Sequence, residues 1–106
     1  MTDKRLILTT APSREEANAI AFELVSRRLA ACVNIIGPMA SVYHWQGEVE
    51  RSEEFLILVK STEAQLLPIQ DAIRELHSYK VPEVLSFAVE SGLESYLEWV
   101  TASVRR

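Results

Sequence analysis

The sequence is poor in three residue types that dominate particular classes of protein. It contains one cysteine, three glycines and four prolines among its 106 residues. The single cysteine, Cys32, excludes an intramolecular disulfide and any metal site that is built from several cysteines. Because so few glycines and prolines leave no obvious linker, we expect residues 1–106 to form a single domain.

Long apolar runs and an excess of positive charge are also missing. No apolar run approaches the roughly 20 residues that a membrane-spanning helix needs, so we expect no membrane partner. The first ten residues (MTDKRLILTT) lack the apolar segment and cleavage site of a signal peptide, which predicts a cytoplasmic protein. The formal charge of −4 argues against a nucleic-acid partner, because such partners require a positively charged surface.

The remaining composition is that of a globular domain. Apolar residues make up 48% of the chain and charged residues 25%, which excludes intrinsic disorder because enough apolar surface is present to offset chain entropy. Two segments, Leu6–Leu8 and Phe55–Val59, are apolar at consecutive positions. This pattern predicts two strands that are buried on both faces of a sheet.

Strand and helix patterns alternate along the chain. Predicted strands cover residues 6–10, 32–45, 48–60 and 84–89, and predicted helices begin near Ser13, Thr62 and Leu93. Ser13 and Thr62 each stand three residues before Glu or Gln, the spacing of a capping box. Two strand–helix–strand units with right-handed crossovers form an α+β, ferredoxin-like split sheet, in which the first and third strands are central. These are the two strands with apolar residues at consecutive positions.

The second and third strands form an unusually long central hairpin. Both exceed the usual ~5–6 residues of a strand, Gly37-Pro38 predicts a bend or bulge, and Gln46-Gly47 is the expected turn. Tyr43 and Trp45 lie near the tip, where a single subunit has no core to bury them. We therefore expect both to contact another subunit of a closed cyclic oligomer, because exposed strand edges also invite pairing. The alternative is that both fold back over a helix of the same chain.

Acidic residues are concentrated in the first half of the third strand. We predict that they form a solvated face of the hairpin that protects its edge; these residues are Glu48, Glu50, Glu53 and Glu54. No glycine-rich phosphate loop is present, and the third strand lacks the aromatic pattern of an RNA-recognition motif.

Several short blocks, spread over almost the whole chain, carry a family pattern. They are Thr10-Ala11-Pro12, Leu29-Ala30-Ala31-Cys32-Val33-Asn34-Ile35, Ser41-x-Tyr43-x-Trp45-x-Gly47, Glu54-x-x-Ile57 running on to Lys60, Leu76-His77-x-Tyr79-x-x-Pro82-Glu83, and Tyr96-Leu97-x-Trp99. Together they resemble the CutA divalent-cation-tolerance family. The resemblance implies a small, cytosolic, non-enzymatic protein that forms a homotrimer similar to that of PII signalling proteins. It also implies tolerance of copper and other divalent metals, with copper binding.

Few residues are candidate metal ligands. A transition-metal site needs several nitrogen, sulfur or oxygen donors that converge on one point, and His77 and Cys32 both stand in blocks of the family pattern. We expect His77 to be exposed in the loop after the second helix and to bind copper or another divalent cation weakly. Some family members carry a cysteine in place of Thr9 and a second histidine in place of Leu76, so this chain lacks two implied ligands. The alternatives are a helix-capping His77 and a buried, structural Cys32.

Lys60, Tyr79 and Glu83 form a second candidate site. Lys60 ends a central strand, and Tyr79 and Glu83 lead into the fourth strand, so we expect all three near a cleft between subunits. A lysine, a phenol and a carboxylate there are typical of a pocket for a small anion or metabolite. The alternative is an ion pair between Lys60 and Glu83 of two subunits. The sequence thus supports two functions: copper tolerance by a non-enzymatic trimer, or PII-like signalling by a trimer that binds a metabolite and reports to a protein partner.

Overall fold

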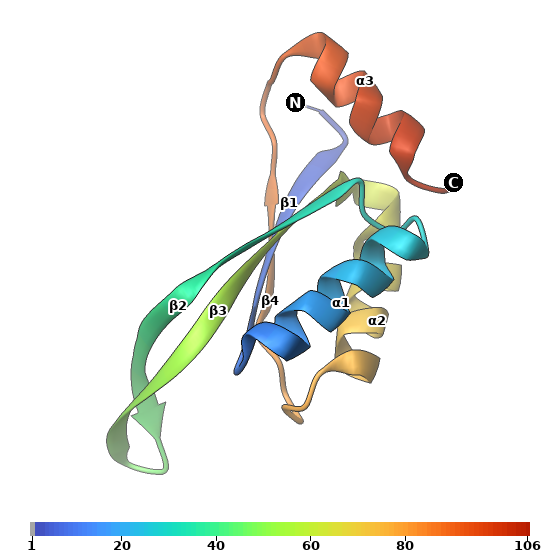
Figure 1. Cartoon of the computed structure of the whole chain (residues 1–106). Helices are drawn as coiled ribbons and strands as arrows, with labels where there is room; N and C mark the ends of the chain where they lie inside the picture. The colour runs from blue at the N-terminus through green and yellow to red at the C-terminus, as the bar shows by residue number, and fades with distance from the viewer. Residues whose placement is uncertain (1) are drawn as a thin grey trace.

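A computed structural model describes residues 2–106. Its elements run in the predicted order (Figure 1) and are β1 (Lys4–Ala11), α1 (Arg14–Ser26), β2 (Cys32–Trp45), β3 (Glu48–Thr62), the short 3₁₀ turn η1 (Glu63–Gln65), α2 (Leu66–Leu76), β4 (Val84–Ala88) and α3 (Glu94–Ser103). No helix between residues 2 and 106 is long and apolar enough to cross a membrane.

The four strands form one antiparallel sheet in the order β2-β3-β1-β4. The first and third strands are therefore central, as the consecutive apolar residues of both strands predict, and the ferredoxin-like fold is confirmed. The outer edges of β2 and β4 have no strand partner within the part of the chain that the structure describes. Each edge presents backbone groups that another strand can bind.

Alternate residues of the strands face opposite sides of the sheet. Ile7 of β1 and Ile57 and Val59 of β3 are completely buried on the side that α1 and α2 cover (Figure 1). We call the opposite side, which carries neither α1 nor α2, the open face. Its apolar residues, placed there by cross-strand register, are Leu6, Leu8, Ile36, Leu56, Leu58, Leu85 and Phe87.

The two helix starts differ from each other at the predicted capping boxes. The Oγ of Ser13 accepts a hydrogen bond from the backbone N–H of Glu16 at 3.1 Å, so the N-cap of α1 is confirmed. Thr62 makes no such bond, and Gln65 instead donates its side-chain amide to the backbone oxygen of Arg105. The capping box at Thr62 was therefore a wrong prediction, because the buried amide of Gln65 tethers the C-terminal segment.

The β2–β3 hairpin extends far beyond the helices (Figure 1). The predicted bulge is present as a register shift between Ile36 and Met39, and Gln46 and Gly47 adopt φ angles of 50° and 81° in the turn. Tyr43 and Trp45 remain 43% and 61% exposed, so neither folds back over a helix of its own chain.

Candidate functional site

His77 follows the last residue of α2 and lies in the interior of the protein, with 8% of its surface exposed. Its Nε2 lies 2.6 Å from the backbone oxygen of Thr10, and its Nδ1 lies 2.9 Å from the backbone nitrogen of Tyr79. In the tautomer in which Nδ1 accepts the N–H of Tyr79, Nε2 carries the hydrogen and donates it to the oxygen of Thr10. The predicted exposure of His77 was wrong, because the loop after α2 folds back against the end of β1.

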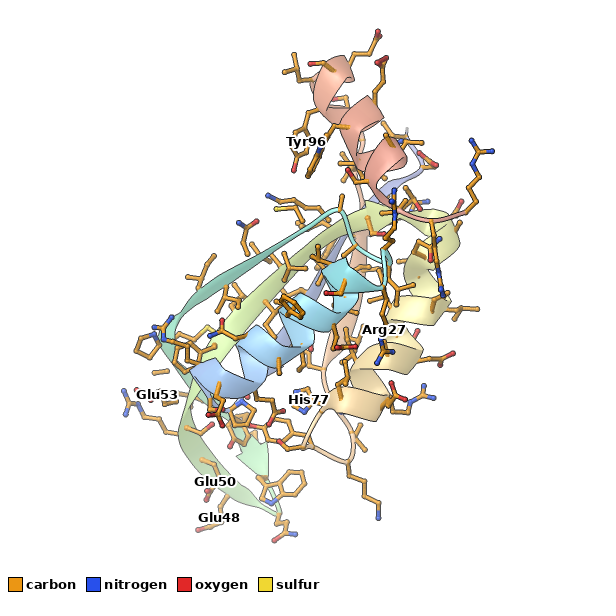
Figure 2. All side chains as sticks on the ribbon, turned by 45° about the vertical axis from the view of Figure 1, so that its right-hand side comes forward. Arg27, Glu48, Glu50, Glu53, His77 and Tyr96 are labelled. Atoms are coloured by element: carbon orange, nitrogen blue, oxygen red, sulfur yellow. The ribbon has the colours of Figure 1, made fainter. Side chains whose placement is uncertain are left out.

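Glu16, in the first turn of α1, fixes this loop from the other side. Its Oε2 accepts hydrogen bonds from the backbone N–H and the hydroxyl of Ser78, both at 3.0 Å, and lies 3.3 Å from Nδ1 of His77. Figure 2 shows His77 beneath α1, near the end of α2. The sequence identified Glu16 only as part of a helix cap, since its second role depends on a segment some 60 residues away.

Tyr79 connects the loop after α2 to Glu54 of β3. Its hydroxyl donates to Oε2 of Glu54 at 3.1 Å, and its ring centroid lies 4.7 Å from that of His77. Burial of the phenol, together with the neighbouring Glu54 carboxylate, raises the pKa of Tyr79 to about 12. The hydroxyl therefore stays protonated at neutral pH and acts as a hydrogen-bond donor.

Glu54 is 9% exposed, so its predicted place on a solvated face was wrong. The prediction remains correct for Glu48, Glu50 and Glu53, which are exposed along the hairpin (Figure 2). The signal that distinguishes Glu54 was present in the sequence: it stands next to the apolar half of β3 and shares the strand parity of Leu56. Glu48 and Glu50 share this parity but lie nearer the hairpin tip, so only the position next to the apolar half of β3 distinguishes Glu54.

Cys32 is partly buried and lies at the opposite end of the sheet from His77. It is paired with Lys60, which in turn is paired with Leu6, whereas His77 binds Thr10, four residues further along β1. Four residues of strand span about 13 Å. The structure therefore does not bring the two predicted metal ligands together within one chain.

The remaining side chains of one chain do not complete a metal site either. Among residues 2–106, no group of three or more His, Cys, Asp or Glu side chains is placed to hold a metal ion. Both ring nitrogens of His77 already have protein partners. Thr9 is buried with a hydroxyl that lacks a hydrogen-bond partner in the described part of the chain. The residues present thus do not fit a resident copper ion.

The second candidate set is also divided between two ends of the sheet. Lys60 lies level with Phe87 across β1, whereas Glu83 precedes the opposite end of β4. Tyr79 approaches Glu54 instead of Lys60. Within one chain, the structure therefore assembles a network of His77, Tyr79 and Glu54, and leaves Lys60 apart from it.

Comparisons with known proteins agree with this fold. The model of the CutA1 divalent ion tolerance protein family matches residues 5–103. The divalent-cation tolerance protein CutA of Thermus thermophilus is 42% identical over 97 residues, which cover 92% of this chain and 94% of that protein. The chloroplastic protein CutA of Arabidopsis thaliana is 37% identical over 100 residues, which cover 94% of this chain and 55% of that protein.

Solved structures give the same result. The crystal structure of CutA from Xylella fastidiosa has a TM-score of 0.96 and 34% sequence identity, covering 98% of this chain and 100% of that chain. The similarity extends over all the strands and helices described above. This chain therefore belongs to the CutA1 divalent ion tolerance family.

Proposed function

We propose that this chain is a non-enzymatic protein of divalent-cation tolerance that works as a homotrimer. The open face is the observation that supports assembly. Leu85 and Phe87 of β4 are half exposed there, and the partly buried Leu6 and Leu8 of β1 lie between them and Leu56 and Leu58 of β3. Contiguous apolar surface of this kind marks a protein interface, and its burial stabilises an assembly by roughly 25 cal/mol per Å².

The hairpin supports the same proposal from a second direction. Tyr43 and Trp45 are exposed near its tip, and large aromatic side chains are frequent anchors of protein interfaces. The free edges of β2 and β4 differ from each other, so a contact between them is head-to-tail, the type of contact that builds a ring when the rotation between copies closes. A ring of three follows from the family resemblance, which implies a PII-like trimer.

Metal binding through His77 is the weaker part of the proposed function. A copper ion at either ring nitrogen has to replace an existing hydrogen bond, to Thr10 or to Tyr79. Such competition lowers affinity, and the neighbouring Glu16 carboxylate offers only an oxygen donor, which is poorly selective. We therefore expect copper or another divalent ion to bind with a dissociation constant above about 1 μM.

A copper titration against a competing chelator tests this expectation. The wild-type protein should bind weakly, His77→Ala should abolish that binding, and Cys32→Ser should leave it unchanged because Cys32 lies at the other end of the sheet. Dissociation below about 1 μM would contradict weak binding. Binding that survives in His77→Ala would move the metal to another site.

The second candidate function is a PII-like trimer that binds a small metabolite or anion between subunits and reports to a protein partner. The hydrogen bond from the partly exposed Tyr79 to the buried Glu54 favours it, because the adjoining open face is where another subunit is expected. A thermal-shift screen separates the two functions, since a ligand of the folded state raises the unfolding midpoint. Anions that raise it while copper does not would favour the metabolite-binding trimer.

The place of this protein in the cell stays a prediction. The sequence predicts the cytoplasm, whereas the Arabidopsis relative is named as chloroplastic. Fractionation of cells that express the full-length natural protein decides between the cytoplasm and another compartment.

A further inference from the structure

Two charged side chains of β3 lack an opposite charge within residues 2–106. Glu54 accepts one hydrogen bond, from the neutral hydroxyl of Tyr79, and has no Lys, Arg or His nitrogen within 4.0 Å. Lys60 is partly buried and has no carboxylate oxygen within that distance. Both stand at the strand parity of the open face, with Leu56 and Leu58 between them.

The other charged residues with restricted exposure have either an opposite charge or at least two hydrogen bonds. Among the cations, Lys4 pairs with Asp3, and Arg5 pairs with Glu63. Among the carboxylates, Glu23 pairs with Arg27 on α1. Glu16 accepts two hydrogen bonds from Ser78 and lies near the His77 ring. Within the described chain, Glu54 and Lys60 are therefore the two restricted charges that have neither an opposite charge nor more than one side-chain hydrogen bond.

Assembly on the open face would make both charges more costly. A buried carboxylate with one neutral hydrogen bond is poorly compensated, and an ammonium covered by apolar surface is strongly destabilising unless it is paired. Leu6 and Phe87, the apolar residues level with Lys60, become buried when a second copy covers this face. Each charge then requires the opposite charge from the covering molecule.

The two residues cannot supply each other within one chain. Six residues of strand separate Glu54 from Lys60, which corresponds to about 20 Å, far beyond the reach of a lysine side chain. In a ring of identical subunits, two different surfaces meet at every contact, so each copy gives one surface to one neighbour and the other surface to the next. One ring can therefore satisfy every Glu54 and every Lys60.

We propose that Lys60 of one copy forms an ion pair with Glu54 of the adjacent copy, where Tyr79 holds the carboxylate in place. The occupant of this part of the open face is thus a second copy of this chain. The negative charge of Glu54 complements the positive charge of Lys60. Other cations without a carboxylate partner in the described chain, such as Arg51 and Lys80, are exposed and stay solvated, so they do not need Glu54. Glu83 is exposed as well, so it has less need of Lys60 than the buried Glu54 has. The inference rests on the homotrimer proposed above.

Charge exchange between two variants tests the pairing. Glu54→Lys and Lys60→Glu each place like charges opposite one another at every contact, and each should raise the dissociation constant of the assembly at least about 30-fold. Analytical ultracentrifugation over a dilution series measures this change. The double variant Glu54→Lys/Lys60→Glu should recover assembly, because every pair is restored with its signs exchanged.

Mixing the two single variants shows whether the pair lies between copies. A mixed ring of three has two contacts with opposite charges and one with like charges, so trimers should reappear on mixing, in contrast to either variant alone. Lys80→Glu is the control, and it should assemble like the wild type. Single variants that assemble normally, or a double variant no better than the single ones, would overturn the proposal.

Two further sets of variants test the proposal if a single variant misfolds or if Lys60 pairs with another carboxylate. If Glu54→Lys fails to fold by circular dichroism, the milder Glu54→Gln, Lys60→Met and their double variant replace it, and additive effects of the two changes would overturn the proposal. Rescue of Lys60→Glu by Glu83→Lys would assign the ion pair to Glu83 instead. A wild-type protein that is monomeric would contradict the proposed function itself, whereas a normal trimer without coupling would contradict only the ion pair.

Discussion

The two faces of the sheet are completed to different degrees within one chain. Under α1 and α2, Ile7, Ile57 and Val59 are fully buried, so this face needs nothing from outside. On the open face, Leu85 and Phe87 are half exposed, and Glu54 and Lys60 have no opposite charge within residues 2–106. Since neighbouring residues of a strand face opposite sides, single substitutions one position apart can separate the stability of the fold from the stability of the assembly.

The largest expected difference is between Ile57→Ala and Leu58→Ala on β3. Ile57→Ala removes a fully buried side chain from the covered core and should lower the free energy of unfolding by about 2–5 kcal/mol at any protein concentration. Leu58→Ala changes the open face and should act mainly on assembly. Chemical denaturation at several protein concentrations distinguishes the two effects. Equal, concentration-independent losses would mean that the two faces contribute in the same way.

Trp45→Ala tests whether the tip of the hairpin contributes to assembly without contributing to the fold. Because Trp45 is exposed in the single chain, its removal should leave the secondary structure unchanged and weaken assembly by about 2 kcal/mol for each contact that it anchors. Light scattering at low micromolar protein measures the effect, with Val49→Ala as the control on the facing strand. An unchanged trimer would show that the hairpin tip does not anchor the interface.

The two histidines allow a buried position to be compared with an exposed one. His77→Ala leaves the buried oxygen of Thr10 without its donor and should destabilise the fold by about 1–3 kcal/mol. His44→Ala, at an exposed hairpin position, should change the free energy of unfolding by less than about 0.5 kcal/mol. Thermal unfolding followed by circular dichroism compares them, and equal midpoints would contradict the structural role of His77.

The smallest expected effect is the pH dependence of stability that arises from Tyr79. Its folded-state pKa of about 12 exceeds the ordinary value of 10.0, so its contribution is fully present below pH 10 and is lost as the pH rises through 12. Tyr79→Phe should remove this loss and the late step of phenolate absorbance, which Tyr96→Phe should retain. A wild-type titration that lacks the late step would contradict the hydrogen bond to Glu54.

The fold was predictable because the signals that specify it are local. Apolar residues at consecutive positions identified β1 and β3 as central strands, and Gln46-Gly47 and Gly37-Pro38 identified the turn and the bulge. Backbone preferences and strand periodicity act over a few residues, so a single sequence contains them.

The candidate site was less predictable because its contacts join distant segments. His77 meets the end of β1, Glu16 of α1 binds the loop after α2, and Tyr79 reaches Glu54 of β3. Sequence position alone made His77 a loop residue and Glu54 one more member of an acidic run. The burial of His77 and the contact of Tyr79 with Glu54 follow from the path of the loop after α2 against the end of β1, which no local pattern specifies.

The bulge at Gly37 sets the direction in which the outer part of the hairpin extends. A Cβ atom at this position would lie 2.7 Å from Cδ2 of Phe55 and 3.1 Å from the backbone oxygen of Glu54, so a larger residue would force the two strands to shift. Trp45 lies eight residues further on, about 26 Å along the strand. A small rotation of the strand at Gly37 therefore moves Trp45 more than it moves the residues next to the bulge. The absence of a Cβ atom at Gly37 therefore allows the close approach of β2 and β3 on which the direction of the hairpin, and with it the position of Trp45, depends.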